Sequence, residues 1–173
     1  IAKIAGVKTV QAINQQHKKK YKAAMLTNMY GPNDNFDLKT SHVVPALIRK
    51  IYEAKIKNQK RVEIWGTGKP KRDVLFVEEA ARAILLYHEK GKNVQIMNIG
   101  SGKELSIKQI AKNICEVVGF KGKLFFNKKY PDGTLRKVLD ISKMKKLGWR
   151  NSVSFKVGIK KTLDWYIKNH ANK

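Results

Sequence analysis

Short apolar runs alternate with runs of helical period along almost the whole chain, and this alternation limits the possible folds more than any other feature. The runs expected to form strands are 23–30, 61–65, 74–77, 94–100 and 123–127. The runs expected to form helices are one that ends near residue 16, then 44–57, 80–90, 107–118 and 155–167. Strands that alternate with helices predict an α/β fold that contains at least part of a parallel sheet.

The helix expected over 107–118 has the clearest end signals. Ser106 and Gln109 have the spacing of a capping box, and Gly119 follows the last apolar position as a helix stop. Cys115, the single cysteine of the chain, lies beside the apolar face of this helix. We therefore expect a small packed thiol there in preference to a nucleophile.

Composition predicts a globular protein of a reducing compartment. The chain has 173 residues, of which 42% are hydrophobic, so it can bury a core. One cysteine excludes an internal disulfide framework, and the cytoplasm is the expected location. No apolar stretch reaches the roughly 20 residues that a membrane-spanning helix needs, so we expect no membrane partner.

The charge balance raises nucleic acid as a partner. Thirty-seven Lys and Arg residues against 13 Asp and Glu residues give a net charge of +24, and such a charge attracts polyanions. However, the lysines are spread over nearly every segment, and no known nucleic-acid-binding signature accompanies them. A basic nucleic-acid-binding domain is therefore an alternative and not the main prediction.

The segment 27–50 combines a strand end, a tight turn and a histidine directly before a helix that is expected to start at Pro45. Ligands in α/β proteins bind near such strand ends. Histidine side chains titrate near neutral pH in general, so His42 could move a proton next to a carbonyl group. A helix cap or a hydrogen-bonded structural histidine is the alternative.

Two turns carry further candidate residues. Trp65 precedes a glycine turn that Arg72 follows, a combination that suits a base to stack on and a phosphate to hold. Asp132 lies in the turn 131–134, where it could accept hydrogen bonds from sugar hydroxyls. Solvated loops are the alternative for both turns. The segment 100–102 is assigned to a turn, and no residues at metal-ligand spacing are found.

Taken together, several motifs resemble the extended short-chain dehydrogenase/reductases, and within them the branch that acts on GDP-linked keto sugars. The motifs are residues 1–6 (IAKIAG), 27–36 (TNMYGPNDNF), 41–47 (SHVVPAL), 65–68 (WGTG) and 131–134 (PDGT). The resemblance implies the rear part of a Rossmann-like enzyme with a smaller α/β substrate-binding domain. Residues 1–32 would end the nucleotide-binding domain, and 33–173 would be mainly the substrate-binding domain, with segments near 74–100 returning to the nucleotide-binding sheet.

The same resemblance implies roles for individual residues. Lys3 would be the lysine of a Tyr-x-x-x-Lys pair, whose ammonium lowers the pKa of the tyrosine and binds the ribose of the cofactor. His42 would be the acid that protonates the sugar during epimerisation. The residues that would border NADP (as NADPH) are Lys3, Leu26, Thr27, Asn28 and Met29. The residues that would hold the GDP-sugar are His42, Lys50, Trp65, Arg72 and Asp132.

The implied activity is epimerisation of GDP-4-keto-6-deoxy-D-mannose at C3 and C5 followed by reduction at C4, in a homodimer. The first helix begins without a cap, so we expect a nucleotide-binding half upstream, together with the paired tyrosine, the glycine-rich loop and the cysteine base of such enzymes. The 173-residue chain alone is expected to be inactive. Another nucleotide-sugar epimerase or dehydratase, and a non-catalytic interaction domain, are the remaining alternatives.

Overall fold

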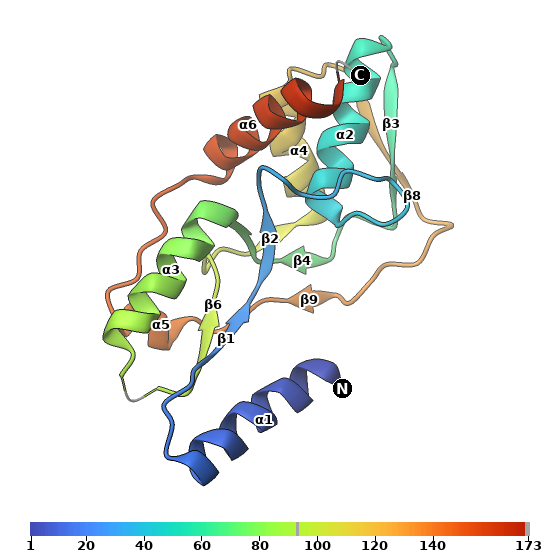
Figure 1. Ribbon diagram of the computed structural model, residues 1–173. Coiled ribbons are helices and arrows are strands. Elements are labelled where there is room, and N and C mark those ends of the chain that lie inside the picture. The colour runs from blue at the N-terminus through green and yellow to red at the C-terminus, as the bar shows by residue number, and fades with distance from the viewer. Residues whose placement is uncertain (93, 172–173) are drawn as a thin grey trace.

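The computed structural model describes residues 1–92 and 94–171, and its elements follow the predicted alternation (Figure 1). The helices are α1 (Ala2–His17), α2 (Val43–Ile56), α3 (Val77–Lys90), α4 (Ile107–Val118), α5 (Ser142–Lys146), α6 (Phe155–Tyr166) and a terminal π-helix η1 (Ile167–Ala171). The strands are β1 (Ala23–Leu26), β2 (Asn28–Tyr30), β3 (Arg61–Trp65), β4 (Lys71–Arg72), β5 (Val74–Phe76), β6 (Ile96–Ile99), β7 (Leu105–Ser106), β8 (Lys123–Asn127) and β9 (Arg136–Lys137).

Parallel pairing dominates, as predicted. β1 pairs with β6, β2 with β5, and β3 with β8, all in parallel. The expectation of one strand over 23–30 was wrong, because the segment changes partner at Thr27. The Thr27 N–H donates to the Ile99 carbonyl oxygen at 3.0 Å, after which the chain leaves β6 and pairs with β5.

The short strand β4 was also missed, because the sequence indicated only a turn up to Lys71. β4 lies between β7, with which it is antiparallel, and β9, with which it is parallel. This small sheet brings Arg72 next to a segment more than sixty residues away in sequence. Two-residue strands carry too little periodicity to be predicted from a sequence.

A first core lies under α2, α4 and α6 at one end of the molecule, with β3 and β8 beside them (Figure 1). Ile48, Ile51, Ile110, Ile114 and Ile159 are all fully buried there. The capping box at Ser106 is present, and Gly119 ends α4 in the left-handed conformation, so both predicted end signals are confirmed. Cys115 packs against this core, and burial raises the pKa of its thiol to about 11.

A second core packs α3 and β6 against the segment 139–149. Met97, Ile99 and Met144 are buried in it, and the Trp149 indole N–H donates to the Gly100 carbonyl oxygen at 3.1 Å. Helix α5, which supplies Met144, was not predicted from the sequence, because Met144 is the one apolar residue among its five. The proposed division into domains remains a prediction.

Helix α1 stands apart from the rest of the described chain (Figure 1). Ile4 is exposed on it, as is its N-cap residue Ile1, and Asn14 is its one buried residue among those described. The Asn14 side chain exchanges two hydrogen bonds of 2.8 Å with the main chain of Tyr21, which fixes the connection from α1 into β1.

Candidate functional site

The centre of the candidate site is a hydrogen-bonded junction between the turn after β3 and the turn before β9. Asp132 accepts hydrogen bonds from the Thr67 main-chain N–H at 2.8 Å and from the Thr67 hydroxyl at 2.6 Å. These bonds hold the pKa of the Asp132 carboxyl below its usual range. Gly66 adopts a φ of +82°, and a Cβ there would collide with Asp132, so glycine is required at this turn.

Arg72 extends the same junction. Its Nη1 donates to the carbonyl oxygens of Lys71 at 2.8 Å and Thr134 at 2.7 Å. Arginine has five N–H donors in a planar arrangement, and within the described residues Nε and Nη2 have no hydrogen-bond partner. The main-chain bonds therefore fix the guanidinium and leave one edge for an external anion such as a phosphate.

Trp65 lies beside these turns with 59% of its surface exposed. The Lys50 ammonium lies 5.2 Å from the centre of its ring, and the ring of Tyr130 stacks on it at 4.5 Å with an angle of 17°. The structure thus brings Lys50, Trp65, Arg72 and Asp132 into one group, and their role in holding a GDP-sugar stays a prediction. Tyr130 was missed, and its position directly before the turn 131–134 was the only available signal.

His42 is the N-cap residue of α2 and is exposed. Its imidazole makes no capping hydrogen bond, so the capping role considered for it is wrong. The helix begins at Val43, which makes Pro45 its third residue and not its first. Burial raises the pKa of Asp34, and the Asn35 main-chain N–H and the neighbouring His42 lower it in part. Because the His42 side chain is exposed and makes no capping hydrogen bond, its imidazole is accessible to a ligand.

The residues predicted to border the cofactor divide into two kinds. Leu26 and Met29 are 37% and 38% exposed, so they offer apolar surface at the junction of β1 and β2. Thr27 and Asn28 instead direct their side chains inward, where both donate to the main-chain oxygen of Asp73, at 2.9 and 3.1 Å. Lys3 is exposed on α1, and within the described residues it has no hydrogen bond or ion pair.

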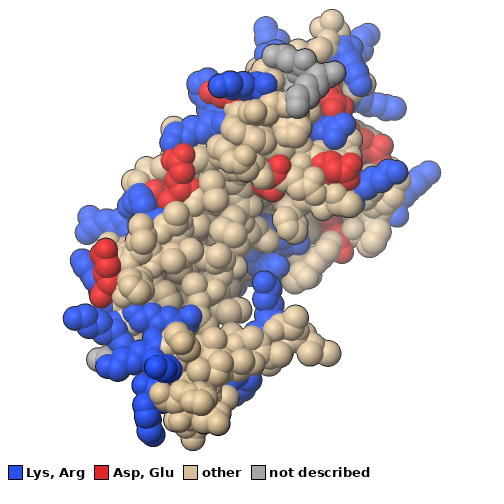
Figure 2. All heavy atoms as spheres, in the orientation of Figure 1, with Lys and Arg blue, Asp and Glu red and all other residues tan. Residues whose placement is uncertain are grey.

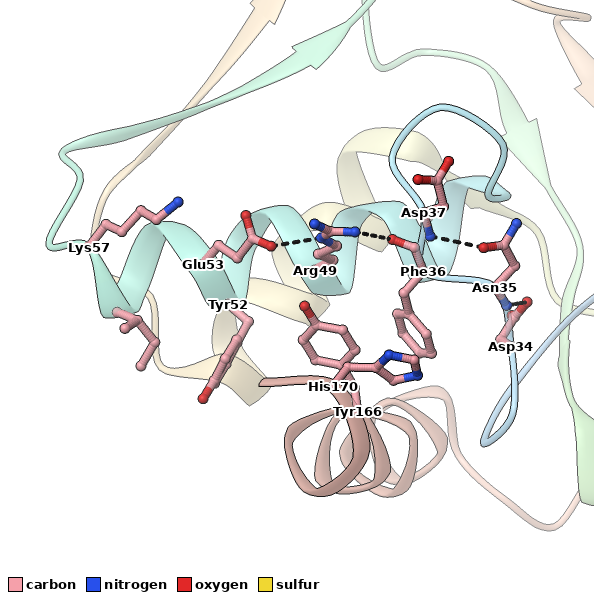
Figure 3. A pocket seen from close by; sticks show the side chains of 11 residues that line it. Asp34, Asn35, Phe36, Asp37, Arg49, Tyr52, Glu53, Lys57, Tyr166 and His170 are labelled. Atoms are coloured by element: carbon pink, nitrogen blue, oxygen red, sulfur yellow. Dashed lines mark hydrogen bonds and ion pairs between the residues drawn. The ribbon is translucent and has the colours of Figure 1, made fainter. Parts of the chain in front are cut away.

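A separate cavity of about 630 Å³ lies between α2 and the end of α6 (Figure 3). Arg49 crosses its floor, donating to Glu53 at 2.7 Å and to the Phe36 carbonyl oxygen at 3.1 Å. The rings of Phe36, Tyr166 and His170 face one another along one wall (Figure 3). None of the predicted site residues lines this cavity, which the sequence analysis missed because its walls come from three separate segments.

On the face shown in Figure 2, Lys and Arg side chains are scattered around the outline of the molecule, with acidic side chains among them. Among the described residues, no group of three His, Cys, Asp or Glu side chains could hold a metal ion. Nor does any helix in the described ranges have the length and apolar character to cross a membrane.

Comparison with known proteins agrees with this geometry. Residues 1–100 match the NAD dependent epimerase/dehydratase family. GDP-L-fucose synthase 1 of Arabidopsis thaliana is 47% identical over 173 residues, which are 100% of this chain and 54% of that protein. GDP-L-fucose synthase of Escherichia coli is 41% identical over 98% of this chain and 56% of its own length. The chain therefore spans about half the length of these curated relatives.

A solved structure described as a GDP-L-fucose synthetase from Naegleria fowleri bound to NADP superimposes with a TM-score of 0.83. It is 28% identical, and the match covers 95% of this chain and 52% of that one. The predicted Rossmann-like α/β fold and the predicted resemblance to nucleotide-sugar enzymes are confirmed. The assignment of this segment to the rear part of such an enzyme stays a prediction.

Proposed function

Because the chain belongs to the NAD dependent epimerase/dehydratase family, we propose that it is part of a GDP-L-fucose synthase. The full-length enzyme converts GDP-4-keto-6-deoxy-D-mannose into GDP-L-fucose by epimerisation at C3 and C5 and reduction at C4. One observation carries the proposal: Lys50, Trp65, Arg72 and Asp132 come from separate segments and lie in one group. That group offers two cations, an aromatic ring and a carboxylate, which suits a nucleotide diphosphate joined to a sugar.

In this proposal Arg72 and Lys50 neutralise the diphosphate, and Asp132 accepts hydrogen bonds from sugar hydroxyls. His42 supplies the proton that completes each epimerisation, since its imidazole is exposed and free of the helix cap. A base elsewhere in the full-length protein removes the proton from the opposite face of the sugar. Proton transfer of this kind needs a group that titrates near neutral pH, as histidine does.

The family uses a nicotinamide dinucleotide, and we propose NADP as the particular cofactor. When bound, it supplies the hydride for C4. The exposed apolar surface of Leu26 and Met29 fits the border of a flat cofactor, and Lys3 would bind its ribose. Thr27 and Asn28 fit less directly, because their side chains are engaged with Asp73. Their contribution is to fix the strand and not to bind the cofactor through these side chains.

The experiment that tests the function uses the full-length protein that contains this segment. NADPH oxidation is followed with GDP-4-keto-6-deoxy-D-mannose, and the product is identified by chromatography and NMR as GDP-L-fucose. Arg72→Ala should raise KM at least about 10-fold with a smaller change in kcat, because a lost charge-assisted hydrogen bond to the diphosphate costs about 1.5–3 kcal/mol. Arg150→Ala, on an exposed residue away from the group, is the matched control. Absence of turnover would overturn the proposal.

A second candidate, a nucleotide-sugar epimerase for another nucleotide, is separated in the same assay by comparing GDP-linked with UDP-linked keto sugars. This comparison tests the choice of nucleobase, because the cations of the group described above would bind any nucleoside diphosphate. We further propose a homodimer in the cytoplasm. The exposed Ile1 and Ile4 on α1 support an association through that helix, and size-exclusion chromatography with light scattering tests it.

A further inference from the structure

Asp73 is a fully buried carboxylate to which the sequence analysis gave no role. One of its oxygens, Oδ1, accepts hydrogen bonds from the Ser101 N–H at 3.0 Å and from the Ser101 hydroxyl at 2.6 Å. The other, Oδ2, is buried and has no hydrogen-bond partner among the described residues. It lies so close to Gly100 that a side chain there would collide with it. The carboxylate therefore fixes the loop 100–102 that follows β6.

The main chain of Asp73 connects two other parts of the candidate site. Its carbonyl oxygen accepts the hydrogen bonds of Thr27 and Asn28 from the proposed cofactor border. Its N–H donates to the Lys137 carbonyl oxygen at 3.3 Å in β9. The preceding residue is Arg72, whose guanidinium belongs to the proposed substrate group. Asp73 thus lies where the two ligand-binding parts meet.

Stability alone does not require a carboxylate at this position. Burial raises the pKa of Asp73, because an ionised group loses hydration that Ser101 replaces only at Oδ1. A neutral amide could accept the same two hydrogen bonds at a lower desolvation cost. An incompletely satisfied buried group in a native protein calls for an explanation, and such groups occur often at functional sites.

We propose that Asp73 is a positioning residue, which holds the loop 100–102 and thereby sets the distance between the substrate group at Arg72 and the cofactor border at Thr27 and Asn28. This inference rests on the proposed function, because it presumes that a sugar and a dinucleotide bind on the two sides of Asp73. Loss of the hydrogen bonds between Asp73 and Ser101 leaves the residues of each binding surface in place. It changes the distance over which the hydride must travel, and a displacement of about 1 Å can lower a rate by about 100-fold.

The test uses Asp73→Ala in the full-length protein, which removes both hydrogen bonds to Ser101, with Asp140→Ala as the matched control. Asp140 also accepts a main-chain N–H, that of Ser142 at 2.8 Å, but lies outside both surfaces. We expect kcat for NADPH oxidation to fall by about 10- to 100-fold in the first variant and by less than about twofold in the control. The dissociation constants of GDP and NADPH, measured by calorimetry, should change by less than about threefold.

Ser101→Ala provides a second variant in case Asp73→Ala does not fold. It removes the shortest bond to the carboxylate, and kcat should fall in the same direction by a smaller factor. If both ligands bind more weakly in proportion to kcat and the melting temperature falls, Asp73 is only structural and the inference is overturned. If the wild-type enzyme is active and the variants have the same kcat, the inference is also overturned. An inactive wild type would instead overturn the proposed function, and this inference with it.

Discussion

At the scale of single residues, the site depends on side chains fixed by main-chain groups far away in sequence. Asp132 holds Thr67 across 65 positions, and Arg72 reaches Thr134 across 62. Each bond restrains a side chain before a ligand binds, so less conformational entropy of that side chain is lost on binding. His42 differs from them, since it is accessible and its imidazole makes no cap bond.

Replacement of His42 by Asn tests its role as the acid. In the full-length enzyme we expect exchange of the C3 and C5 hydrogens with deuterated water, followed by NMR, to slow by about 100-fold or more. The melting temperature should change little, because an exposed side chain without a cap bond contributes less than about 0.5 kcal/mol. Ser41→Ala is a neighbouring control, and exchange at the wild-type rate in His42→Asn would contradict the role.

Replacement of Thr67 by Val tests the link to Asp132. The folded-state pKa of Asp132 is lowered, chiefly by the Thr67 side chain. Asp132 therefore stabilises the folded protein at a pH above its pKa in the unfolded state. This contribution is lost as the pH falls through its lower pKa in the folded state. The variant should raise this pKa toward the usual value of 3.8 and begin acid unfolding at higher pH. NMR titration of the carboxyl carbon measures the shift, and an unmoved pKa would refute the link.

At the scale of elements, helix α4 shows how local signals and packing act together. Its capping box satisfies two main-chain N–H groups at the helix start, those of Ser106 and Gln109. Its apolar face, meanwhile, lies in the core between α2 and α6. Ser106 also belongs to β7, which pairs with the strand that carries Arg72. The start of α4 is therefore tied to the position of the substrate group.

Replacement of Ser106 by Ala should lower the free energy of unfolding by about 1 kcal/mol, because the Gln109 main-chain N–H loses its partner. Urea denaturation followed by circular dichroism measures the change. Ser142→Ala is the matched control, since Ser142 lies in the first turn of α5 and caps no helix end there. Equal stability of both variants would show that the capping box contributes nothing.

Helix α2 allows a comparison of buried and exposed positions on one element. Ile51 is 0% exposed and Ile56 is 60% exposed. Ile51→Ala should cost about 2–5 kcal/mol through the cavity it leaves, whereas Ile56→Ala should cost less than about 0.5 kcal/mol. Urea denaturation of both variants gives the difference between their free energies of unfolding, which reports how much the packing of Ile51 contributes to the first core. A difference below about 1 kcal/mol would mean that α2 is not packed as described.

At the scale of the whole molecule, the net charge of +24 comes from Lys and Arg residues that are spread over nearly every segment of the sequence. The space-filling view shows cations scattered along the outline (Figure 2). A dispersed charge attracts polyanions at low ionic strength, but salt screens charges that lie more than about 10 Å apart at 0.1 M. Non-specific attraction is the expected consequence, and a dedicated nucleic-acid site is not.

Binding to duplex DNA tests this distribution of charge. We expect association in 20 mM salt, measured by fluorescence anisotropy, to disappear by about 150 mM because neutralised phosphates recapture their counterions. GDP binding should persist at the higher salt, since Arg72 holds phosphate through directed hydrogen bonds. A submicromolar DNA complex at 150 mM would favour the nucleic-acid alternative. Free mononucleotide serves as the control for non-specific quenching.

The sequence alone was sufficient for features with a local cause. The helices with apolar periodicity, the capping box at Ser106 and the stop at Gly119 were predicted correctly because neighbouring residues determine them. The prediction of one continuous strand over 23–30 was wrong, because the change of partner at Thr27 depends on strands more than forty residues away in sequence. The short strand β4 and helix α5 were missed for lack of periodicity.

The candidate residues were likewise found from the motifs that contain them, whereas their arrangement was not. Only the tertiary structure decided that Asp132 binds Thr67, that Tyr130 stacks on Trp65 and that Asp73 lies between two surfaces. The physical reason is the range of the interactions. Capping and helical period act within a few residues of sequence, but these contacts need the chain to have closed loops of dozens of residues, which only the packed cores make favourable.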